Sequence, residues 1–449
     1  MTTENAKYIK YSESNGKGKF KIGEIEKETS FKLEFYLGQD AILYMDEDFF
    51  SEINRSFINK KKNEPIIASL SGILENGAKI RIDHLILIQP SCLEKGKSTP
   101  IKFKVFSPVI ISKYLQNSSP ENEEIHFLIT NFEFTGCDKT IYPNGGWKLN
   151  QLSVNVGGYT LIIKQVENYE NIIKQLKHKN SLSAITAEII IKSPIKDRDK
   201  IYPIVEDICS LCSFANGNSV VPVIEKHFSN VNLVFERISS MRIDPFSGGN
   251  QLIPNLPPEV IRDFVDNTHT AYVNYKDKLG LNILINYYLL MKSNPILDIR
   301  CLLGFVLLEC LSDHAQEYYS KLGKPIDSSL RKGQISKLKK ILPRSNNLSK
   351  KTLDKIIDEF VYKYPTLQDS INQLMNDFGM RQKRGEGRLF ELRKSFIHKG
   401  MYPKGTTDHI VIYRSLVHFI DRLILNILGY KSIYLNIADN YKIEEINPK

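Results

Sequence analysis

The chain has 449 residues, of which 42% are hydrophobic and 25% are charged, and it carries a formal net charge of +10. This composition is ordinary for globular proteins and excludes a mainly disordered or fibrous chain, while the length allows two or three domains. The N-terminus is polar and the strongest apolar runs are shorter than the roughly 18 residues that a spanning helix needs, so we expect neither an export signal nor a membrane anchor. The expected location is the cytoplasm, and the basic charge is compatible with a polyanionic partner without identifying one.

A cytoplasmic location would keep the six cysteines reduced. Two of them, Cys209 and Cys212, form a single CxxC pair, but no second pair or CxxH follows at the spacing of a zinc site. The surrounding segment has the pattern of an apolar helix, so buried packing cysteines are favoured over a metal or redox site. We therefore expect neither a metal nor a cofactor.

Short alternating or β-branched runs dominate the first half of the chain and predict strands. These runs cover residues 31–37, 66–70, 79–87, 101–112, 125–134, 152–156, 160–166, 184–191, 220–227 and 231–238. Two helices are expected at 169–178 and 202–214, and the second ends at Asn216-Gly217, a left-handed stop. We expect a mostly antiparallel β domain over residues 1–245.

The apolar period changes after residues 244–250, a Pro- and Gly-containing segment that predicts a domain boundary. Beyond it, spacings of three and four predict helices. They cover residues 260–275, 281–292, 297–314, 335–342, 353–362, 367–378, 387–399 and 408–428. Thr366 and Asp369 resemble a capping box. Residues 251–449 are thus expected to form an all-α domain, and the chain to be a multidomain α+β protein.

The most informative motif lies in the predicted helix at 387–399, where Arg393 precedes His398 by five positions. An imidazole moves protons near neutral pH and a guanidinium holds a phosphate through paired hydrogen bonds, so the two together can cleave RNA without a metal. The general pattern of Arg, four to six residues and then His is weak evidence, because Arg262 and His269 also fit it. Apolar neighbours and a following Gly400 place His398 in the last helical turn, where both basic residues are equally compatible with solvation of the helix end.

A five-residue offset on an ideal helix separates two side chains by about 140° and by roughly 7.5 Å along the axis. One helix therefore does not close a compact site. The economical arrangement is a two-fold dimer in which the motif of each subunit faces its copy.

Several other residues are candidates to support this motif. Glu309 lies in a helix that is apolar nearly all round, so its carboxylate should pair with Arg393 or another cation, unless it lies at the helix rim. Lys394 offers a phosphate contact, and Ser395 either orients the imidazole or bonds to the backbone. Basic residues that are candidates to guide RNA, or that form solvated faces, cluster in two groups. They are Arg331, Lys332, Lys337, Lys339, Lys340, Arg344, Lys350 and Lys351, and Arg381, Lys383, Arg384, Arg388 and Lys399.

Three segments carry a family resemblance. Residues 389–400, LFELRKSFIHKG, are similar to an LRN-x-x-x-H-x-G core; residues 416–434, LVHFIDRLILNILGYKSIY, look like a closing helix with an LLGY ending; and residues 209–218 look like an upstream LLSFAxG helix. Together they resemble the HEPN superfamily, specifically its ApeA-like branch, which combines a β-rich N-terminal region with a C-terminal HEPN domain. The resemblance is strong in the last sixty or so residues and is not detected in the first two hundred.

This resemblance implies a metal-independent endoribonuclease of an anti-phage or abortive-infection system, working as a homodimer through its helical domain. Arg393 and His398 match the catalytic pair, and the implied reaction is attack of the ribose 2′-hydroxyl to leave a 2′,3′-cyclic phosphate. The N-terminal domain is then expected to sense a phage-derived trigger or to restrain the helical domain. Lys394 departs from the family pattern, which has a small polar residue there, and this departure favours the alternative of an inactive module that binds RNA or a partner protein.

A third interpretation makes the β-rich half itself a hydrolase or a sugar-binding domain. Its candidates are Asp83, His84 and His126, which lie in predicted strands. Neither a nucleophile elbow nor a ligand spacing surrounds them, so this interpretation is the least favoured.

Overall fold

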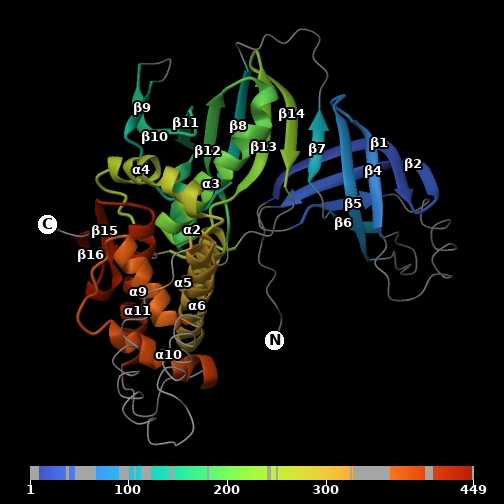
Figure 1. Cartoon of the computed structure of the whole chain (residues 1–449). Coiled ribbons are helices and arrows are strands. Elements are labelled where there is room, and N and C mark those ends of the chain that lie inside the picture. Colours follow the sequence, from blue (N-terminus) through green and yellow to red (C-terminus); the bar gives the residue numbers. More distant parts are fainter. Residues whose placement is uncertain are drawn as a thin grey trace, which may run out of the picture. The chain divides into compact units, whose positions relative to one another are not determined.

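The computed structural model describes residues 10–36, 40–45, 67–89, 101–105, 108–112, 123–141, 145–178, 182–239, 244–248, 251–323, 326, 365–399 and 408–446. Its contacts divide the chain into two compact units, Met1–Cys212 with Asn218–Gly249, and Ser213–Gly217 with Asn250–Lys449. The first unit is rich in antiparallel strands and the second in helices, so the fold class is α+β (Figure 1). The main division falls in the segment 244–250, but the short stretch 213–217 joins the second unit.

The first six strands close into an antiparallel barrel. Its strands are β1 (Lys10–Ile22), β2 (Ile25–Tyr36), β3 (Ile42–Met45), β4 (Ile67–Leu74), β5 (Lys79–Gln89) and β6 (Ile101–Val105). They follow the order β4-β1-β2-β3-β6-β5, and an additional pairing of β4 with β5 completes the ring. Closure removes the unpaired edges that an open sheet would expose.

Alternating apolar side chains fill this barrel. Phe20, Leu33, Leu43 and Ile82 are fully buried at its centre. Glycines on β1 and β4 let the two strands approach, because a Cβ at Gly18 would lie 2.5 Å from the carbonyl oxygen of Ser71. This use of glycine at inward-facing positions explains why the sequence of β1 carries so little apolar signal.

The sheet continues beyond the barrel through the pairing of β5 with β7 (Val109–Ser112). The remaining strands follow in the order β14 (Asn232–Ile238), β13 (Pro222–Ser229), β8 (Glu123–Thr130), β12 (Ile185–Lys192), β11 (Tyr159–Gln165), β10 (Trp147–Val156) and β9 (Asp138–Ile141). Every one of these pairings is antiparallel.

Two helices pack on this part of the sheet. In α2 (Tyr169–His178), the Tyr169 hydroxyl donates to the carbonyl oxygen of Phe134 at 2.9 Å and accepts from its amide at 2.7 Å. The short 3-10 turn Ile195–Asp197 leads into α3 (Arg198–Asn216). At the start of α3, Arg198 donates two hydrogen bonds, of 2.6 and 3.0 Å, to Glu225 of β13. The helix ends at Gly217, whose φ of 65° confirms the predicted left-handed stop.

The second unit is a helical assembly around one central helix. Its helices are α4 (Glu259–Tyr275), α5 (Leu281–Ser293), α6 (Leu297–Lys321), α9 (Leu367–Asp377), α10 (Gly387–Lys399) and α11 (His409–Ile427). Helix α11 is buried on nearly all sides, as expected for the centre of a bundle. The predicted capping box is confirmed, because Thr366 and Asp369 exchange their side-chain and backbone hydrogen bonds at the start of α9.

Three sequence-based expectations are corrected. The run 101–112 forms two strands, β6 and β7, and the run 125–134 ends as a strand at Thr130. The expected closing helix at 416–434 stops at Ile427, since Gly429 adopts a φ of 68° and the chain then forms a hairpin. This hairpin pairs β15 (Ile433–Asn436) with β16 (Lys442–Glu445) around the 3-10 turn Ile437–Asp439.

The predicted helices at 335–342 and 353–362 lie outside the described residues. Within the part of the chain that is described, no helix is both long enough and apolar enough to cross a membrane.

Candidate functional site

Helix α10, which carries the Arg/His motif, is fixed to two neighbouring helices by aromatic contacts. The ring of Phe396 lies 5.3 Å from that of Phe305 on α6, and Phe390 meets Phe419 on α11 edge to face at 5.9 Å. Aromatic pairs of this kind contribute about 0.5–1.5 kcal/mol beyond their buried area. They set the rotation of α10 and therefore which of its residues meet α6.

That rotation brings Arg393 against Glu309 of α6, and the two side chains form an ion pair. The expected pairing of Glu309 is thus confirmed, with Arg393 as its partner. Both side chains are about 30% exposed, at 30% and 28%, so the pair lies at the surface rather than in the core. Partial burial lowers the pKa of Arg393, but a guanidinium remains protonated at any physiological pH.

The Arg393 guanidinium has donors to spare beyond this ion pair. Its Nε is buried and makes no hydrogen bond to any described group. A guanidinium carries five N–H donors in a rigid fork, which suits two oxygens of one planar or tetrahedral anion. Glu309 therefore holds the group in place through Nη2, and because Nε is buried, only the exposed part of the guanidinium is open to a ligand.

The backbone of His398 lies in the last turn of α10, as the sequence predicts. The side chains of Lys394, Ser395, His398 and Lys399 lie outside the described part of the structure. Positions 393 and 398 thus share one helix, five residues apart.

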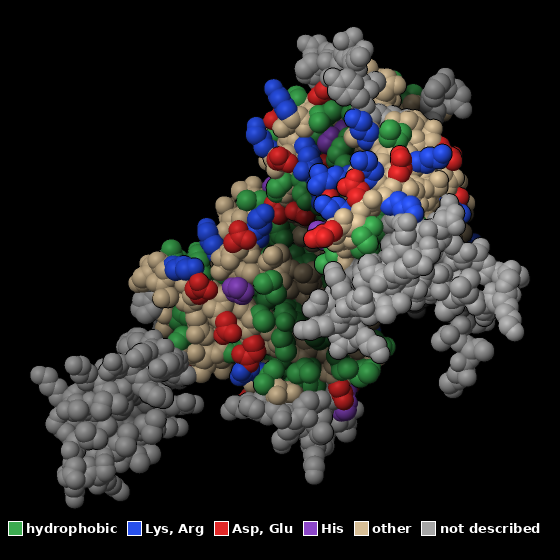
Figure 2. Space-filling view, turned by 90° about the vertical axis from the view of Figure 1, so that its right-hand side faces the viewer, with side chains coloured by type: hydrophobic (Ala, Val, Ile, Leu, Met, Phe, Trp, Pro, Cys, Tyr) green, Lys and Arg blue, Asp and Glu red, His purple; other side chains and the backbone are tan. Residues whose placement is uncertain are grey.

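The basic candidates before α10 differ in their surroundings. Arg381, Arg384 and Arg388 are exposed, whereas the ammonium group of Lys383 contacts Glu444 at 3.0 Å and His418 at 3.1 Å. The cluster from Arg331 to Lys351 lies outside the described residues. On the face drawn in Figure 2, basic and acidic side chains intermingle, so charge alone does not mark a path for RNA there.

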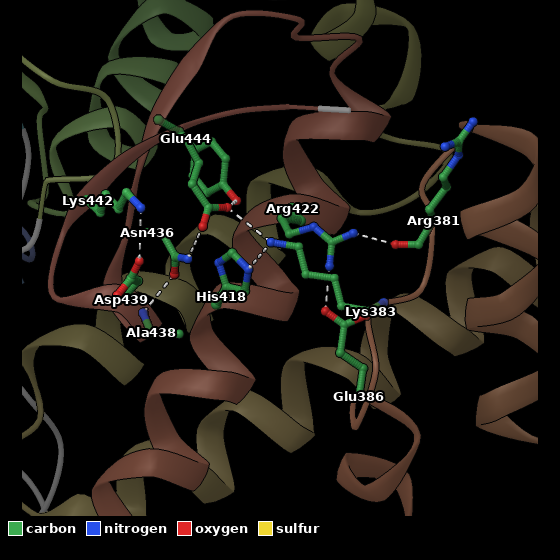
Figure 3. Close-up of polar contacts among 11 residues, drawn as sticks. Arg381, Lys383, Glu386, His418, Arg422, Asn436, Ala438, Asp439, Lys442 and Glu444 are labelled. Carbon is green, nitrogen blue, oxygen red and sulfur yellow. Dashed lines mark hydrogen bonds and ion pairs between the residues drawn. The ribbon is translucent and has the colours of Figure 1, made fainter. Parts of the chain in front are cut away.

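Lys383 belongs to a polar network that the sequence did not reveal (Figure 3). Glu444 at the end of the C-terminal hairpin accepts hydrogen bonds from Lys383, from the Tyr434 hydroxyl at 2.9 Å and from the Asn436 amide at 2.6 Å. Burial alone would raise the pKa of Glu444, but these hydrogen bonds lower it to about 2. The carboxylate is therefore ionised at all physiological pH values.

The imidazole of His418 on α11 is the neutral member of this network. Burial, followed by the positive charges of Lys383 and Arg422, lowers the pKa of His418 to about 4. A neutral imidazole is the form that can accept at Nε2 from an ammonium group, as Lys383 requires. Its Nδ1 has no hydrogen-bond partner among the described groups.

A second part of the network fixes the start of α10. Arg422 of α11 donates to Glu386 at 2.5 Å and to the carbonyl oxygen of Arg381, while Glu386 accepts from the Lys383 amide at 2.7 Å. The Arg422 and Glu386 side chains are only 7% and 8% exposed. The partners are 36 residues apart in the chain, so no local sequence pattern indicated this contact.

The core of the helical unit holds a further buried charge. Asp421 of α11 is fully buried, and its Oδ1 accepts from the Tyr288 hydroxyl at 2.7 Å. The Lys292 ammonium, also buried, lies 4.7 Å from the centre of the Tyr288 ring. Burial raises the pKa of Asp421 to about 6, against the opposing effect of Lys292.

The candidates in the first unit do not form one site. Asp83 and His84 lie on β5 of the barrel, and Asp83 pairs with Arg81 at 2.7 Å. His126 lies on β8, which is not a neighbour of β5, and its ring nitrogens contact Glu188 at 2.8 Å and Glu124 at 3.1 Å.

The two cysteines of the CxxC pair are buried, as predicted. Burial raises the pKa of Cys209 and Cys212, so both thiols are protonated. Among the described residues, no group of three or more His, Cys, Asp or Glu side chains has the geometry to hold a metal ion.

One segment of the chain matches the model of a known family. Residues 117–249 match the model of the YopA central domain, a segment that contains β8 to β14 with α2 and α3. Neither a curated protein nor a solved structure matches the chain. The match covers a minority of the residues and lies wholly outside α10.

Proposed function

We propose that the helical unit is a HEPN-type endoribonuclease that needs no metal and acts in an anti-phage or abortive-infection response. The observation that carries this proposal is the Arg393–Glu309 ion pair, which holds a partly exposed guanidinium five residues before His398 on one helix. A guanidinium that is held in advance stabilises developing phosphorane charge without reorganisation during the reaction.

In the proposed reaction the ribose 2′-hydroxyl attacks the adjacent phosphorus, and the bond to the 5′-oxygen of the next nucleotide breaks. His398 takes the hydroxyl proton or delivers one to the leaving 5′-oxygen, and Arg393 binds the non-bridging oxygens. The products carry a 2′,3′-cyclic phosphate and a 5′-hydroxyl.

We propose that two copies of the chain complete the site. Because one helix separates positions 393 and 398 by about 140°, the arginine of one subunit and the histidine of its partner meet more readily across a two-fold axis. The β-rich unit is then the part that senses a phage-derived signal or restrains cleavage.

The test compares purified full-length wild type, Arg393→Ala and His398→Ala on RNA in the presence of a chelator, with the new ends mapped. Each substitution is expected to slow cleavage by on the order of 100-fold or more. Glu391→Gln, an exposed position on the same helix, is the matched control and should cleave as wild type does. Equal cleavage by wild type and His398→Ala would end the catalytic assignment.

Mixing the two inactive variants tests the dimer. A heterodimer of Arg393→Ala with His398→Ala regenerates one intact Arg/His combination if the site forms between subunits. Recovered cleavage supports the shared site, whereas continued inactivity places both groups of one site in the same subunit.

An alternative is a non-catalytic module that binds RNA or a protein through the same surface. Lys394 favours it, since the charge differs from the small polar residue of the family pattern, and Glu309 partly neutralises Arg393. This alternative predicts salt-dependent RNA binding without cleavage, and overexpression that is equally harmless for wild type and Arg393→Ala during phage challenge.

A further inference from the structure

The barrel of the first unit has a hollow of about 880 Å³ at one end. Its floor comes from side chains and backbone that face the barrel interior: Gly16, Phe31, Met45 and Leu74. Its rim is mostly polar and is contributed by the other lining residues: Asn15, Lys17, Ser30, Lys32, Glu34, Tyr44, Ile73 and Glu75. Ligand sites of small barrels commonly lie in such mouths and have volumes of about 300–1,000 Å³.

The strand register explains why the hollow exists. β1 pairs with β2 from Ile22 back to Lys10, but its pairing with β4 reaches only Gly16. The Phe31 ring occupies the space over Gly16, because a Cβ there would lie 2.6 Å from Cζ of Phe31. The aromatic ring of Phe31 therefore forms part of the wall of an open barrel end.

The rim combines an aromatic ring with charges of both signs, Lys17 and Lys32 against Glu34 and Glu75. Tyr44 lies opposite Lys32 in the register of β2 and β3, and the Lys102 ammonium lies 5.7 Å from the centre of the Tyr44 ring. Lys32 is held by Glu34 at 3.0 Å and by Glu13 at 3.2 Å. Lys17 is exposed and makes no ion pair with any described residue, so its charge is available to a ligand.

We propose that this barrel mouth binds a nucleotide, with the base against the Tyr44 ring and the phosphate at Lys17. Stacking of bases on aromatic rings beside lysines is the usual physical basis for binding nucleotides without sequence preference. Asn15 and Ser30 on the rim supply amide and hydroxyl groups for the edges of the base. The proposal does not depend on ribonuclease activity in the helical unit.

Other ligand classes fit the hollow less well. A fatty acid requires apolar walls along its length, but six of the eight rim residues are charged or carry an amide or aliphatic hydroxyl group. A neutral sugar would make no use of the Lys17 charge. A planar base with a phosphate suits both the Tyr44 ring and the Lys17 cation, and it comes either from a free mononucleotide or from the end of an RNA strand.

The experiment measures binding to the full-length protein by calorimetry. The probes are AMP, GMP, CMP and UMP, a single-stranded RNA octamer with and without a 5′-phosphate, inorganic phosphate, adenosine and decanoate. The Arg393→Ala background is used for the octamer, so that cleavage does not confuse the result. Tighter binding of mononucleotides identifies a free nucleotide as ligand, and tighter binding of the octamer identifies an RNA end.

Two variants and one control locate the site. Lys17→Glu should weaken nucleotide binding by about tenfold or more, and Tyr44→Leu by roughly 5- to 100-fold. Lys21→Glu, an exposed position on the same strand outside the hollow, should bind as wild type does. Circular dichroism checks that each variant is folded.

Three results would overturn the proposal: no nucleotide binding by wild type at millimolar concentration, binding that Lys17→Glu and Tyr44→Leu leave unchanged, or binding of decanoate in preference to every nucleotide. If wild type binds nucleotides but does not cleave RNA, the proposed ribonuclease is refuted and the nucleotide site is not.

Discussion

Among single residues, Glu309 is the one whose substitution distinguishes an effect on the position of Arg393 from an effect on stability. Its ion pair with Arg393 is partly exposed, and pairs of this kind contribute about 0.2–1 kcal/mol to folding. We therefore expect Glu309→Gln to change the free energy of unfolding by less than about 1 kcal/mol. RNA cleavage should nevertheless fall by about tenfold or more, because the guanidinium loses the group that holds it.

Urea unfolding and single-turnover cleavage measure these two effects. Glu317→Gln is the matched control, since Glu317 lies on the same helix and forms an exposed pair with Lys321 at 2.7 Å. If Glu309→Gln slows cleavage only in proportion to the fraction of unfolded protein, the residue acts through folding alone.

Asp421 gives the helical unit a pH dependence of known sign. Burial raises its pKa from 3.8 to about 6, so the folded state binds the proton more tightly than the unfolded chain does. The stability that this group contributes is therefore fully present below its unfolded pKa and is lost as pH rises through about 6. Asp421→Asn removes the titration.

We expect the free energy of unfolding of wild type, relative to Asp421→Asn, to fall by ~2–3 kcal/mol between about pH 4 and pH 7.5. Urea unfolding at a series of pH values measures this difference. A difference that stays constant with pH would show that Asp421 does not titrate in this range.

Local and distant contacts of single residues differ in how far the sequence predicts them. The capping box of Thr366 and Asp369 spans three residues, so its pattern is visible in the chain, and the structure confirms it. Glu309 was found because a carboxylate in an apolar helix needs a partner. Lys383 and Glu444 are 61 residues apart, and each lies in a polar segment. A charged side chain in a polar segment needs no partner, so the sequence of neither segment predicts this contact.

Among the described elements, α10 is connected to its neighbour by a buried ion pair. Arg422 and Glu386 connect its start to the central helix α11 and are both nearly inaccessible. Removing one partner of a buried pair leaves an uncompensated charge, so Arg422→Met should lower the free energy of unfolding by about 3–5 kcal/mol. Amide hydrogen exchange should show the largest loss of protection in α10.

Replacement of both partners distinguishes charge burial from packing. The double variant Arg422→Met with Glu386→Leu should be less destabilised than Arg422→Met alone, because no charge is left unpaired. Asp439→Asn is the control, since its pair with Lys442 is exposed and 3.8 Å long. A double variant that is as unstable as the sum of the single variants would contradict this account.

Several helices with an apolar period were predicted closely, whereas some strands were missed, among them β1 and β3. The bounds of α2 and α10 agree with the expected ranges 169–178 and 387–399. β1 was not predicted, because its inward positions include Gly16 and Gly18 and its outward positions are mostly charged or polar. The C-terminal hairpin was read as part of a helix, since Ile433 and Tyr434 continue the apolar run of α11.

The division of the chain into two units follows from its composition, but the sharing of α3 does not. The switch from a strand period to a helix period near residue 250 predicts a boundary there. Closure of the barrel requires β4 to pair with both β1 and β5, and such pairings depend on contacts that no local pattern encodes. In the same way, the last turn of α3 joins the second unit because of a packing contact, not because of its own sequence.

That contact makes Phe214 a test of how the two units depend on each other. Phe214 is fully buried, its ring lies 4.8 Å from that of Tyr288 on α5, and its neighbour Ala215 accepts hydrogen bonds from the Leu252 and Ile253 amides. Phe214→Ala should lower the stability of the helical unit by about 3–5 kcal/mol. The single tryptophan, Trp147 on β10, reports on the first unit alone.

Urea unfolding is therefore followed by helical circular dichroism and by Trp147 fluorescence in the same samples. Phe214→Ala should move the dichroism midpoint to lower urea more than the fluorescence midpoint, because the lost contacts lie in the second unit. Phe127→Ala removes a fully buried ring of the first unit, whose centre lies 6.0 Å from the centre of the Tyr202 ring. This variant should move the fluorescence midpoint to lower urea more than the dichroism midpoint. Coincident shifts of both probes in both variants would mean that α3 joins the two units into one cooperative structure.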